Sequence, residues 1–198
     1  IIYIGSLISY ILGNFINNDI NKSHHLNSVS IIIAVKNGEQ SLPNILYDLN
    51  HQDYNGESEY IIVDDQSTDN TAEIIKNYSQ KNEKIIYVSS KEGNIKLSFK
   101  KRALDAGIRK SKYDILIFTD VDCRLKKEWV KSMASCFYNQ VDYVIGVSEI
   151  SKPLNIISRF QKIDLLMMMT AGMAKCNLES PIASTGQNQA YKKYLYYK

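Results

Sequence analysis

Two carboxylates, Asp120 and Asp122, stand one residue apart in the stretch FTDVDC, directly after the apolar run YDILIF. Charge at the end of a buried strand costs free energy unless a partner compensates for it. Hard divalent cations take oxygen ligands, and two acids on alternate residues need only a slight bend to face one ion. The pair is therefore a candidate site for Mg²⁺ or Mn²⁺. The alternative is that Asp120 caps the following segment and Asp122 is solvated.

The segments around these acids alternate between strand-like and helix-like patterns. Continuous apolar runs such as VSIIIAV are typical of strands that are buried on both faces. Asn70 followed by Glu73 predicts a capping box at the start of a helix. We expect strands at 29–35, 59–65, 84–89, 113–120 and 141–150, and helices at 41–50, 67–80, 100–110 and 126–137. The alternation predicts an α/β fold, an open and mostly parallel sheet flanked by helices.

Polar side chains gather at the predicted carboxyl ends of three strands. They are Lys36 and Asn37, then Asp64 and Asp65, then Asp120 with Asp122. In open α/β sheets, ligands bind outside the carboxyl ends of the strands. None of the nine glycines forms a GxG pattern, and GxxxxGK[ST] is also missing. A phosphate bound at this edge would therefore rely on a cation held by carboxylates more than on a glycine-rich loop.

Composition limits the alternatives. A net charge of +3 over 198 residues is too small to indicate nucleic-acid binding. Cys123, Cys136 and Cys176 are widely spaced and include no CxxC pair, which favours a reducing compartment over a disulfide framework or a zinc site.

The N-terminal region is expected to be a separate part of the chain. Residues 1–16 carry no charge, but they fall short of the ~20 residues that cross a bilayer. We expect a truncated transmembrane helix at 1–16, a polar linker at 17–28 and the main domain at 29–198. Such an anchor would place the domain at a membrane, facing the cytoplasm, where nucleotide sugars and reduced cysteines coexist.

Four motifs in this order resemble family 2 glycosyltransferases of the GT-A fold, over roughly residues 28–150. The motifs are VSIIIAVKNGEQSLPNIL, VDDQSTDNTAEII, KKRALDAGI and YDILIFTDVDC. The later stretch FQKIDLLMMM…PIASTGQNQAYKK is similar to the membrane-anchored bacterial branch of that family. The resemblance implies transfer of a sugar from a nucleotide sugar, by default a UDP-sugar, to an acceptor, with inversion and with a divalent cation.

The resemblance also implies roles for single residues. It assigns Asp65 to the nucleoside of the donor and Lys100 to the region of the diphosphate. It places Asp120 near the ribose and the metal, and makes Asp122 the direct metal ligand.

Further positions follow from the same resemblance. Backbone atoms of Ala34 and Val35 would line the base pocket. Gly186, Gln187 and Asn188 would face the donor sugar and the acceptor. We expect Asp64 to hold nearby backbone N–H groups. We expect the run at 165–169 to be buried core, with contact to a membrane as the alternative.

Catalysis needs a general base for the acceptor hydroxyl. The resemblance places that base, and a Q-x-x-R-W motif, beyond Lys198, so no base is assigned within residues 1–198. Two alternatives stay open: a membrane-tethered nucleotide-binding scaffold, and a sugar nucleotidyltransferase. The second is disfavoured because the loop AVKNGEQSLP holds one glycine and no arginine.

Overall fold

The computed structural model describes residues 12, 13, 15, 26–150, 155–178 and 185–198. The expected apolar helix at 1–16 and linker at 17–28 lie mostly outside these residues. No helix in the described part of the chain is both long and apolar enough to cross a membrane. The chain divides into two compact units, Asn21–Gly146 with Gly186–Lys198, and Ile1–Ile20 with Val147–Thr185.

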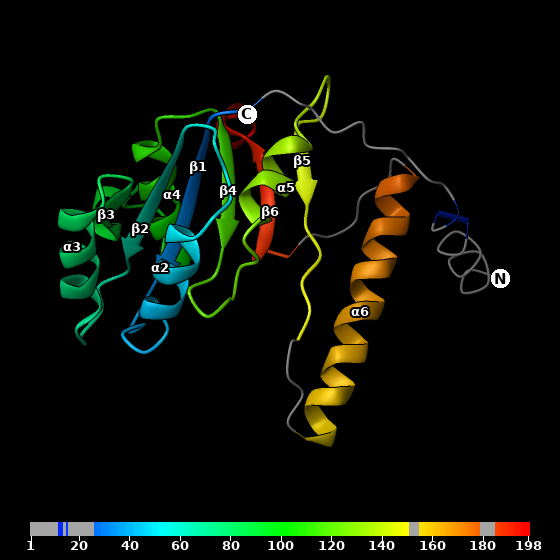
Figure 1. Ribbon diagram of the computed structural model, residues 1–198, viewed down its shortest axis with the longest axis horizontal. Helices are drawn as coiled ribbons and strands as arrows, with labels where there is room; N and C mark the ends of the chain where they lie inside the picture. The colour runs from blue at the N-terminus through cyan, green and yellow to red at the C-terminus, as the bar shows by residue number, and fades with distance from the viewer. Residues whose placement is uncertain (1–11, 14, 16–25, 151–154, 179–184) are drawn as a thin grey trace. The chain divides into compact units, whose positions relative to one another are not determined.

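The first unit is built on a six-stranded sheet with the order β3-β2-β1-β4-β6-β5 (Figure 1). The strands are β1 (Val29–Val35), β2 (Ser58–Asp64), β3 (Ile85–Ser89), β4 (Ile115–Thr119), β5 (Tyr143–Ile145) and β6 (Asn188–Lys192). β1 pairs in parallel with both β2 and β4, and β2 pairs in parallel with β3. The predicted mostly parallel α/β sheet is therefore confirmed.

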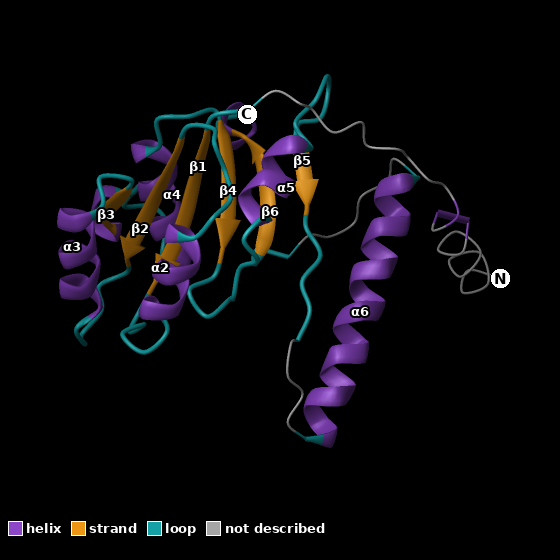
Figure 2. Ribbon diagram, in the orientation of Figure 1, coloured by secondary structure: helices purple, strands orange, loops and turns teal. Residues whose placement is uncertain are grey.

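Helices cover both faces of this sheet (Figure 2). α2 (Leu42–Asn50), α3 (Thr71–Lys81) and α5 (Trp129–Ser135) share one core with Ile31 and Ile33 of β1. α4 (Phe99–Lys110) packs on the other face, against Ile32 of β1 and its neighbours. Because successive side chains of a strand point to opposite faces, the run Ile31–Ile33 supplies both cores, which explains its unbroken apolar character. Two short 3₁₀ helices, η1 (Ser90–Glu92) and η2 (Lys193–Tyr196), complete the unit.

The fifth strand differs from its prediction. The run at 141–150 was expected to be one strand, but β5 covers only Tyr143–Ile145 and pairs antiparallel with β6. Its partner explains the length, because β6 begins at Asn188, whose carbonyl accepts the Gly146 N–H at 2.9 Å. Beyond that point β6 offers β5 no further residue to pair with.

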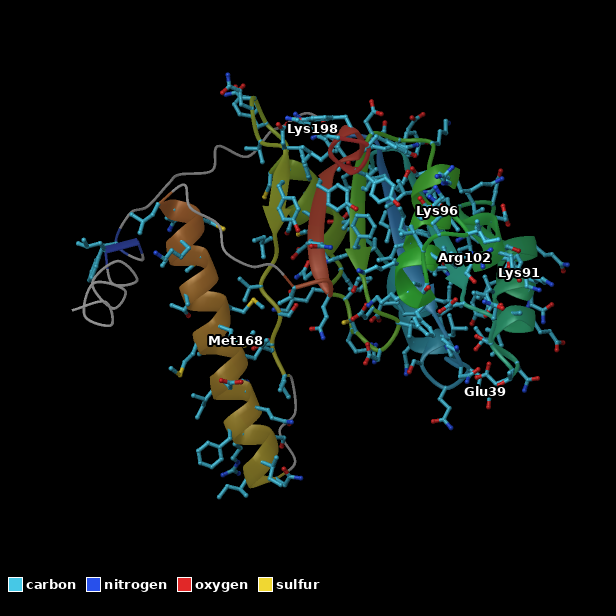
Figure 3. The ribbon with its side chains drawn as sticks, turned by 180° about the vertical axis from the view of Figure 1, so that it is seen from behind. Glu39, Lys91, Lys96, Arg102, Met168 and Lys198 are labelled. Carbon is cyan, nitrogen blue, oxygen red and sulfur yellow. The ribbon has the colours of Figure 1, made fainter. Side chains whose placement is uncertain are left out.

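The second unit contains the helix α6 (Ile156–Asn177). Asn155 begins it with a capping box, in which its side chain accepts from Ser158 N at 2.8 Å. The prediction that residues 165–169 are buried core is wrong. Leu166, Met167 and Met168 are 59%, 66% and 58% exposed (Met168 is labelled in Figure 3). Ala174 is the buried position of α6 in the described unit, so little of this helix is covered there.

Candidate functional site

The carboxyl ends of β1, β2 and β4 bring the predicted acids to one edge. β1 pairs Val35 with Asp64 and Ile32 with Phe118. Asp65 follows β2 directly, and its N–H donates to the carbonyl of Val35 at 2.7 Å. Since Asp120 follows β4 directly, both carboxylates lie where these parallel strands end, which confirms the predicted shared edge.

Ala34 and Val35 are the last residues of β1, and their role in lining a base pocket stays a prediction. The Val35 side chain packs in the core, whereas Ala34 is half-buried on the α4 face. The Val35 carbonyl already accepts a hydrogen bond from the Asp65 N–H. This bond connects the start of the loop after β1 to the start of the loop after β2.

Those two loops are held together by side chains. The Asn37 side-chain oxygen accepts from Thr68 N at 2.9 Å, and Gly38 N donates to Thr71 Oγ1 at 2.8 Å. Asn37 and Gln66 have φ values of 51° and 55°, the left-handed region that most residues avoid. The predicted capping box at Asn70 is wrong: no side-chain cap forms there, and Asn70 instead donates to Glu39 at 3.0 Å.

The two neighbouring acids of β2 have different surroundings. Asp64 accepts from Ser67 N at 3.1 Å, which confirms its predicted structural role. Asp65 is 7% exposed, and none of the described residues donates a hydrogen bond to its carboxylate. The Asp65 carboxylate therefore keeps its acceptor capacity for hydrogen bonds from a ligand.

Lys100 reaches Asp120 across the edge. Its Nζ lies 2.5 Å from Oδ1, with the lysine side chain 54% exposed and the aspartate side chain 22% exposed. Phe99, which begins α4, has a φ of 51° and is 78% exposed. A bulky residue in the left-handed region is unusual and tends to mark functional segments.

A basic surface surrounds this ion pair. An open pocket of 440 Å³ is lined by Lys96, Lys100 and Lys101 together with the three residues between Lys96 and Lys100. Arg102 also lies here and donates to the Lys91 carbonyl at 3.0 Å (Figure 3). Three of the six lining residues are lysines.

Asp122 lies in the turn after β4 and is exposed. The turn is closed by Cys123 N, which donates to the Asp120 carbonyl at 3.2 Å. Burial raises the pKa of the Cys123 thiol, which follows Asp122 directly.

The segment with Gly186, Gln187 and Asn188 also reaches this edge. Asn188 begins β6 opposite Thr119, which places it beside Asp120 along the sheet. Its side-chain oxygen accepts from Trp129 Nε1 at 3.0 Å, and Trp129 also packs against the core on the α2 and α5 side of the sheet. Gly186 and Gln187 form the turn that leads into β6. We did not predict that this segment would be a strand.

The donor set fits one kind of cation site. No group of three or more His, Cys, Asp or Glu side chains gathers as a metal cage among the described residues. Two carboxylates are available, and one of them is already paired with Lys100. Mg²⁺ characteristically binds through one or two carboxylates and substrate phosphates, and retains water. Asp120 and Asp122 therefore fit a cation that shares its ligands with a diphosphate.

Sequence reasoning missed two buried acids, Asp48 of α2 and Asp105 of α4. Asp48 pairs with Arg124, and Asp105 binds Arg109 and Tyr196. A signal was present, because Asp48 stands among Ile45, Leu46 and Leu49 on the apolar stripe of its helix. An acid on such a stripe needs a partner.

The structure is an open, mostly parallel α/β sheet with acids and a lysine at its carboxyl edge, where sheets of this class bind their ligands. The model of the family described as Glycosyl transferase family 2 matches residues 30–195, and the chain belongs to this family.

Individual relatives agree with this assignment. The chain is 37% identical over 101 residues to 4,4'-diaponeurosporenoate glycosyltransferase of Staphylococcus haemolyticus, which covers 51% of this chain and 26% of the relative. The structure of S. aureus TarS 1–349 in complex with UDP-GlcNAc is similar with 25% identity and a TM-score of 0.51, covering 63% of this chain and 35% of that one.

A further structure shows the fold over nearly the whole chain. It is the mannosyltransferase PcManGT of Pyrobaculum calidifontis in complex with GDP-Man and Mn²⁺. The TM-score is 0.75 at 17% identity, with 98% of this chain and 54% of that one covered. The chain thus spans about a quarter of the curated relative and about half of this mannosyltransferase.

Proposed function

We propose that this chain is the donor-binding part of a glycosyltransferase that uses a UDP-sugar as its donor. The reaction requires a divalent cation and inverts the configuration at the sugar carbon that is transferred. The observation that carries the proposal is the convergence of Asp65, Lys100 and Asp120 at one sheet edge. A nucleotide sugar presents a nucleoside, a diphosphate and a sugar in a row. The edge offers an acid without a donor, a lysine and a pair of carboxylates.

Each residue would act on a different part of the donor. Asp65 would accept hydrogen bonds from the nucleoside. Lys100 would leave Asp120 to bind the diphosphate, stabilising the charge that develops as the sugar–oxygen bond breaks. Asp120 and Asp122 would hold the cation, which when bound neutralises the same charge.

The transfer itself forms one bond and breaks another. The acceptor oxygen attacks the sugar carbon, and the electron pair of the broken bond leaves with the nucleoside diphosphate. The acceptor's proton goes to a general base, which the family resemblance places beyond Lys198 and which we do not assign within this chain. Asn188, beside Asp120 along the sheet, and the turn at 186–187 would border the sugar and the acceptor.

Two relatives support the donor class. S. aureus TarS 1–349, at 25% identity, is described with UDP-GlcNAc and also with UDP. The mannosyltransferase, similar in fold alone, is described with GDP-Man and Mn²⁺. The loop that follows β1 contains Gly38 and no arginine, which speaks against a sugar nucleotidyltransferase.

We further propose that the domain works at a membrane, on its cytoplasmic side. The uncharged stretch at 1–16 supports the attachment. Cys123, Cys136 and Cys176 are thiols rather than disulfides, which suits a reducing compartment.

Thermal unfolding with a panel of nucleoside diphosphates tests the donor class. A ligand that binds the folded protein raises its melting temperature. With Mn²⁺ present, UDP should raise it more than GDP, CDP or ADP at equal concentration. A chain that none of these nucleotides stabilises would contradict the proposal.

A further inference from the structure

The loop that carries Asp122 is fixed to α2 by one buried carboxylate. Asp48 Oδ2 accepts from Arg124 Nε at 2.8 Å and from Leu125 N at 2.9 Å, while Oδ1 accepts from Arg124 Nη2 at 2.9 Å. Asp48 is 7% exposed and lies 76 residues before Arg124. A bidentate Arg–carboxylate pair fixes orientation as well as distance.

The next residues of the same segment continue the attachment. Gln52 donates to the Lys126 carbonyl at 3.0 Å and accepts from Val130 N at 3.0 Å. Asp53 N donates to the Lys127 carbonyl at 2.7 Å. The chain from Arg124 to Val130 is therefore held along the C-terminal end of α2.

The attachment matters because the loop has little regular structure of its own. β4 ends at Thr119, and α5 begins at Trp129. Asp122 lies between these two elements, so its position depends on how both ends of the loop are held. β4 fixes one end of the loop. The Asp48 carboxylate holds the other end through its hydrogen bond from the backbone N–H of Leu125, three residues after Asp122.

Charge gives a second reason. Arg124 is two residues from Asp122, and its side chain is 60% exposed. Asp48 occupies the guanidinium through two hydrogen bonds, which holds the arginine away from the other carboxylates of the loop. An Arg124 released from Asp48 could pair with Asp122 and compete with a cation.

We propose that Asp48 is a positioning residue for the cation site: it fixes the 120–128 loop and occupies Arg124, so that Asp122 stays available to a metal-bound diphosphate. This inference rests on the proposed function, since it assumes that a cation binds at Asp120 and Asp122. Asp48 itself touches neither ligand nor reacting atoms.

Calorimetric titration of UDP into Asp48→Asn, once with Mn²⁺ and once with EDTA, tests this role. Loss of a residue that supports metal ligands lowers metal affinity by about 10- to 100-fold. We expect a similar loss of UDP affinity in Mn²⁺ and less than about threefold change in EDTA. Asp142→Asn is the matched control. Asp142 lies in the same unit and pairs with Lys192 at 2.8 Å, but it directly precedes β5 and has no part in this loop. It should change neither value.

Other outcomes overturn the inference. Equal losses of UDP affinity in Mn²⁺ and EDTA would mean that Asp48 only stabilises the domain, and unchanged affinity in both would mean that it does not position the loop. If Asp48→Asn does not fold, Arg124→Met tests the attachment alone, because it removes two of the three hydrogen bonds to Asp48 and leaves no arginine to compete at Asp122. A smaller selective loss of UDP affinity in Mn²⁺ is then expected, and no loss would overturn the positioning role.

A metal-free measurement separates this inference from the proposed function. Hydrogen exchange of the amides at 121–128, without nucleotide or metal, should be faster in Asp48→Asn than in the wild type and unchanged in Asp142→Asn. If wild-type protein binds UDP with the same affinity with and without Mn²⁺, the cation site is contradicted, and the role of Asp48 in metal binding is contradicted with it. Unchanged exchange in the loop would refute the attachment itself.

Discussion

Lys100 and Asp120 are joined by an ion pair of 2.5 Å, although they lie 20 residues apart on α4 and after β4. The resemblance to the family suggested that Lys100 serves the diphosphate and that a cation compensates Asp120. In the structure, the lysine itself compensates the aspartate. Because the lysine side chain is 54% exposed, it is free to move to a phosphate when one arrives.

Lys100→Met should therefore change metal and nucleotide binding in opposite directions. Without the lysine, Asp120 has lost a competing cation, so Mn²⁺ alone should bind more tightly. UDP with Mn²⁺ should bind about tenfold more weakly, since a hydrogen bond to a charged group contributes about 1.5–3 kcal/mol. Electron paramagnetic resonance of unbound Mn²⁺ and calorimetry of UDP measure the two effects.

Lys101→Met is the control for this pair of measurements. Lys101 is the next residue of α4 and is exposed. Its substitution removes the same charge but no contact with Asp120. Its effects should be small in both titrations. Equal effects from the two substitutions would show that only the overall charge of the basic surface matters.

Asp122→Asn and Asp65→Asn should separate the metal from the nucleoside. The first keeps the shape of the loop and removes one charge, so it should weaken UDP binding in Mn²⁺ and leave binding in EDTA unchanged. The second changes the buried acid at the end of β2, so it should weaken UDP binding in both conditions. Identical profiles for the two variants would show that the acids do not have separate roles.

Asp105 should stabilise the fold in a pH-dependent way. Burial alone would raise its pKa, but hydrogen bonds from Tyr196, Asn94 N and Arg109 outweigh burial and hold the pKa below its usual value. The stabilisation is then fully present above the unfolded pKa of about 3.9 and is lost as the pH falls through the lower folded value. Asp105→Asn should lower the free energy of unfolding by about 1–3 kcal/mol at pH 7.

Urea denaturation at several pH values measures this contribution. The difference between wild type and Asp105→Asn should shrink as the pH falls below about 4. Tyr196→Phe removes one of the hydrogen bonds, 2.6 Å long, and should cost about 1 kcal/mol. A difference between wild type and Asp105→Asn that stays constant down to acid pH would contradict the ionised carboxylate.

Gly107 should resist a side chain because α4 lies so close to β1. A Cβ at this position would lie 2.6 Å from Ile32 Cγ2 and 3.1 Å from Val63 Cγ2. Overpacking costs about 1–3 kcal/mol, while alanine regains about 1 kcal/mol of helix propensity. Gly107→Ala should therefore lower the free energy of unfolding by about 1 kcal/mol net.

Gly186→Ala is the matched control, because no heavy atom of the described residues, its two chain neighbours aside, lies within 4 Å of a Cβ built there. Its free energy of unfolding should stay within about 0.5 kcal/mol of the wild type. Chemical denaturation compares the two variants. If Gly107→Ala is as stable as Gly186→Ala, α4 can move away from the sheet at that position without a loss of stability.

The parallel half of the fold was predictable because its strands are apolar on both faces. Runs such as VSIIIAV and EYIIVD are typical of strands in a parallel sheet that is buried on both faces. In such a sheet, the acids that follow the strands lie at the same edge. β6 was not predictable in the same way. Its sequence NQAYK has no β-branched residue, and it becomes a strand because β4 and β5 each offer it an open edge.

The contacts that organise the site were also beyond the sequence. Lys100 and Asp120 come together only once α4 lies across the sheet. Asp48 could be flagged as an acid on an apolar stripe, but nothing local identifies Arg124 as its partner. The left-handed backbone at Phe99 lacks any glycine or asparagine to signal it.

The central claim is that Asp120 and Asp122 share a divalent cation with a nucleoside diphosphate. Two ligands that complete each other's coordination must bind with positive coupling, and each tightens the other by the same factor. Calorimetric titration of UDP into the wild-type chain, in Mn²⁺ and in EDTA, measures that factor directly. We predict at least about tenfold tighter binding in Mn²⁺, within the usual range of such coupling. Equal affinity in Mn²⁺ and in EDTA would contradict it.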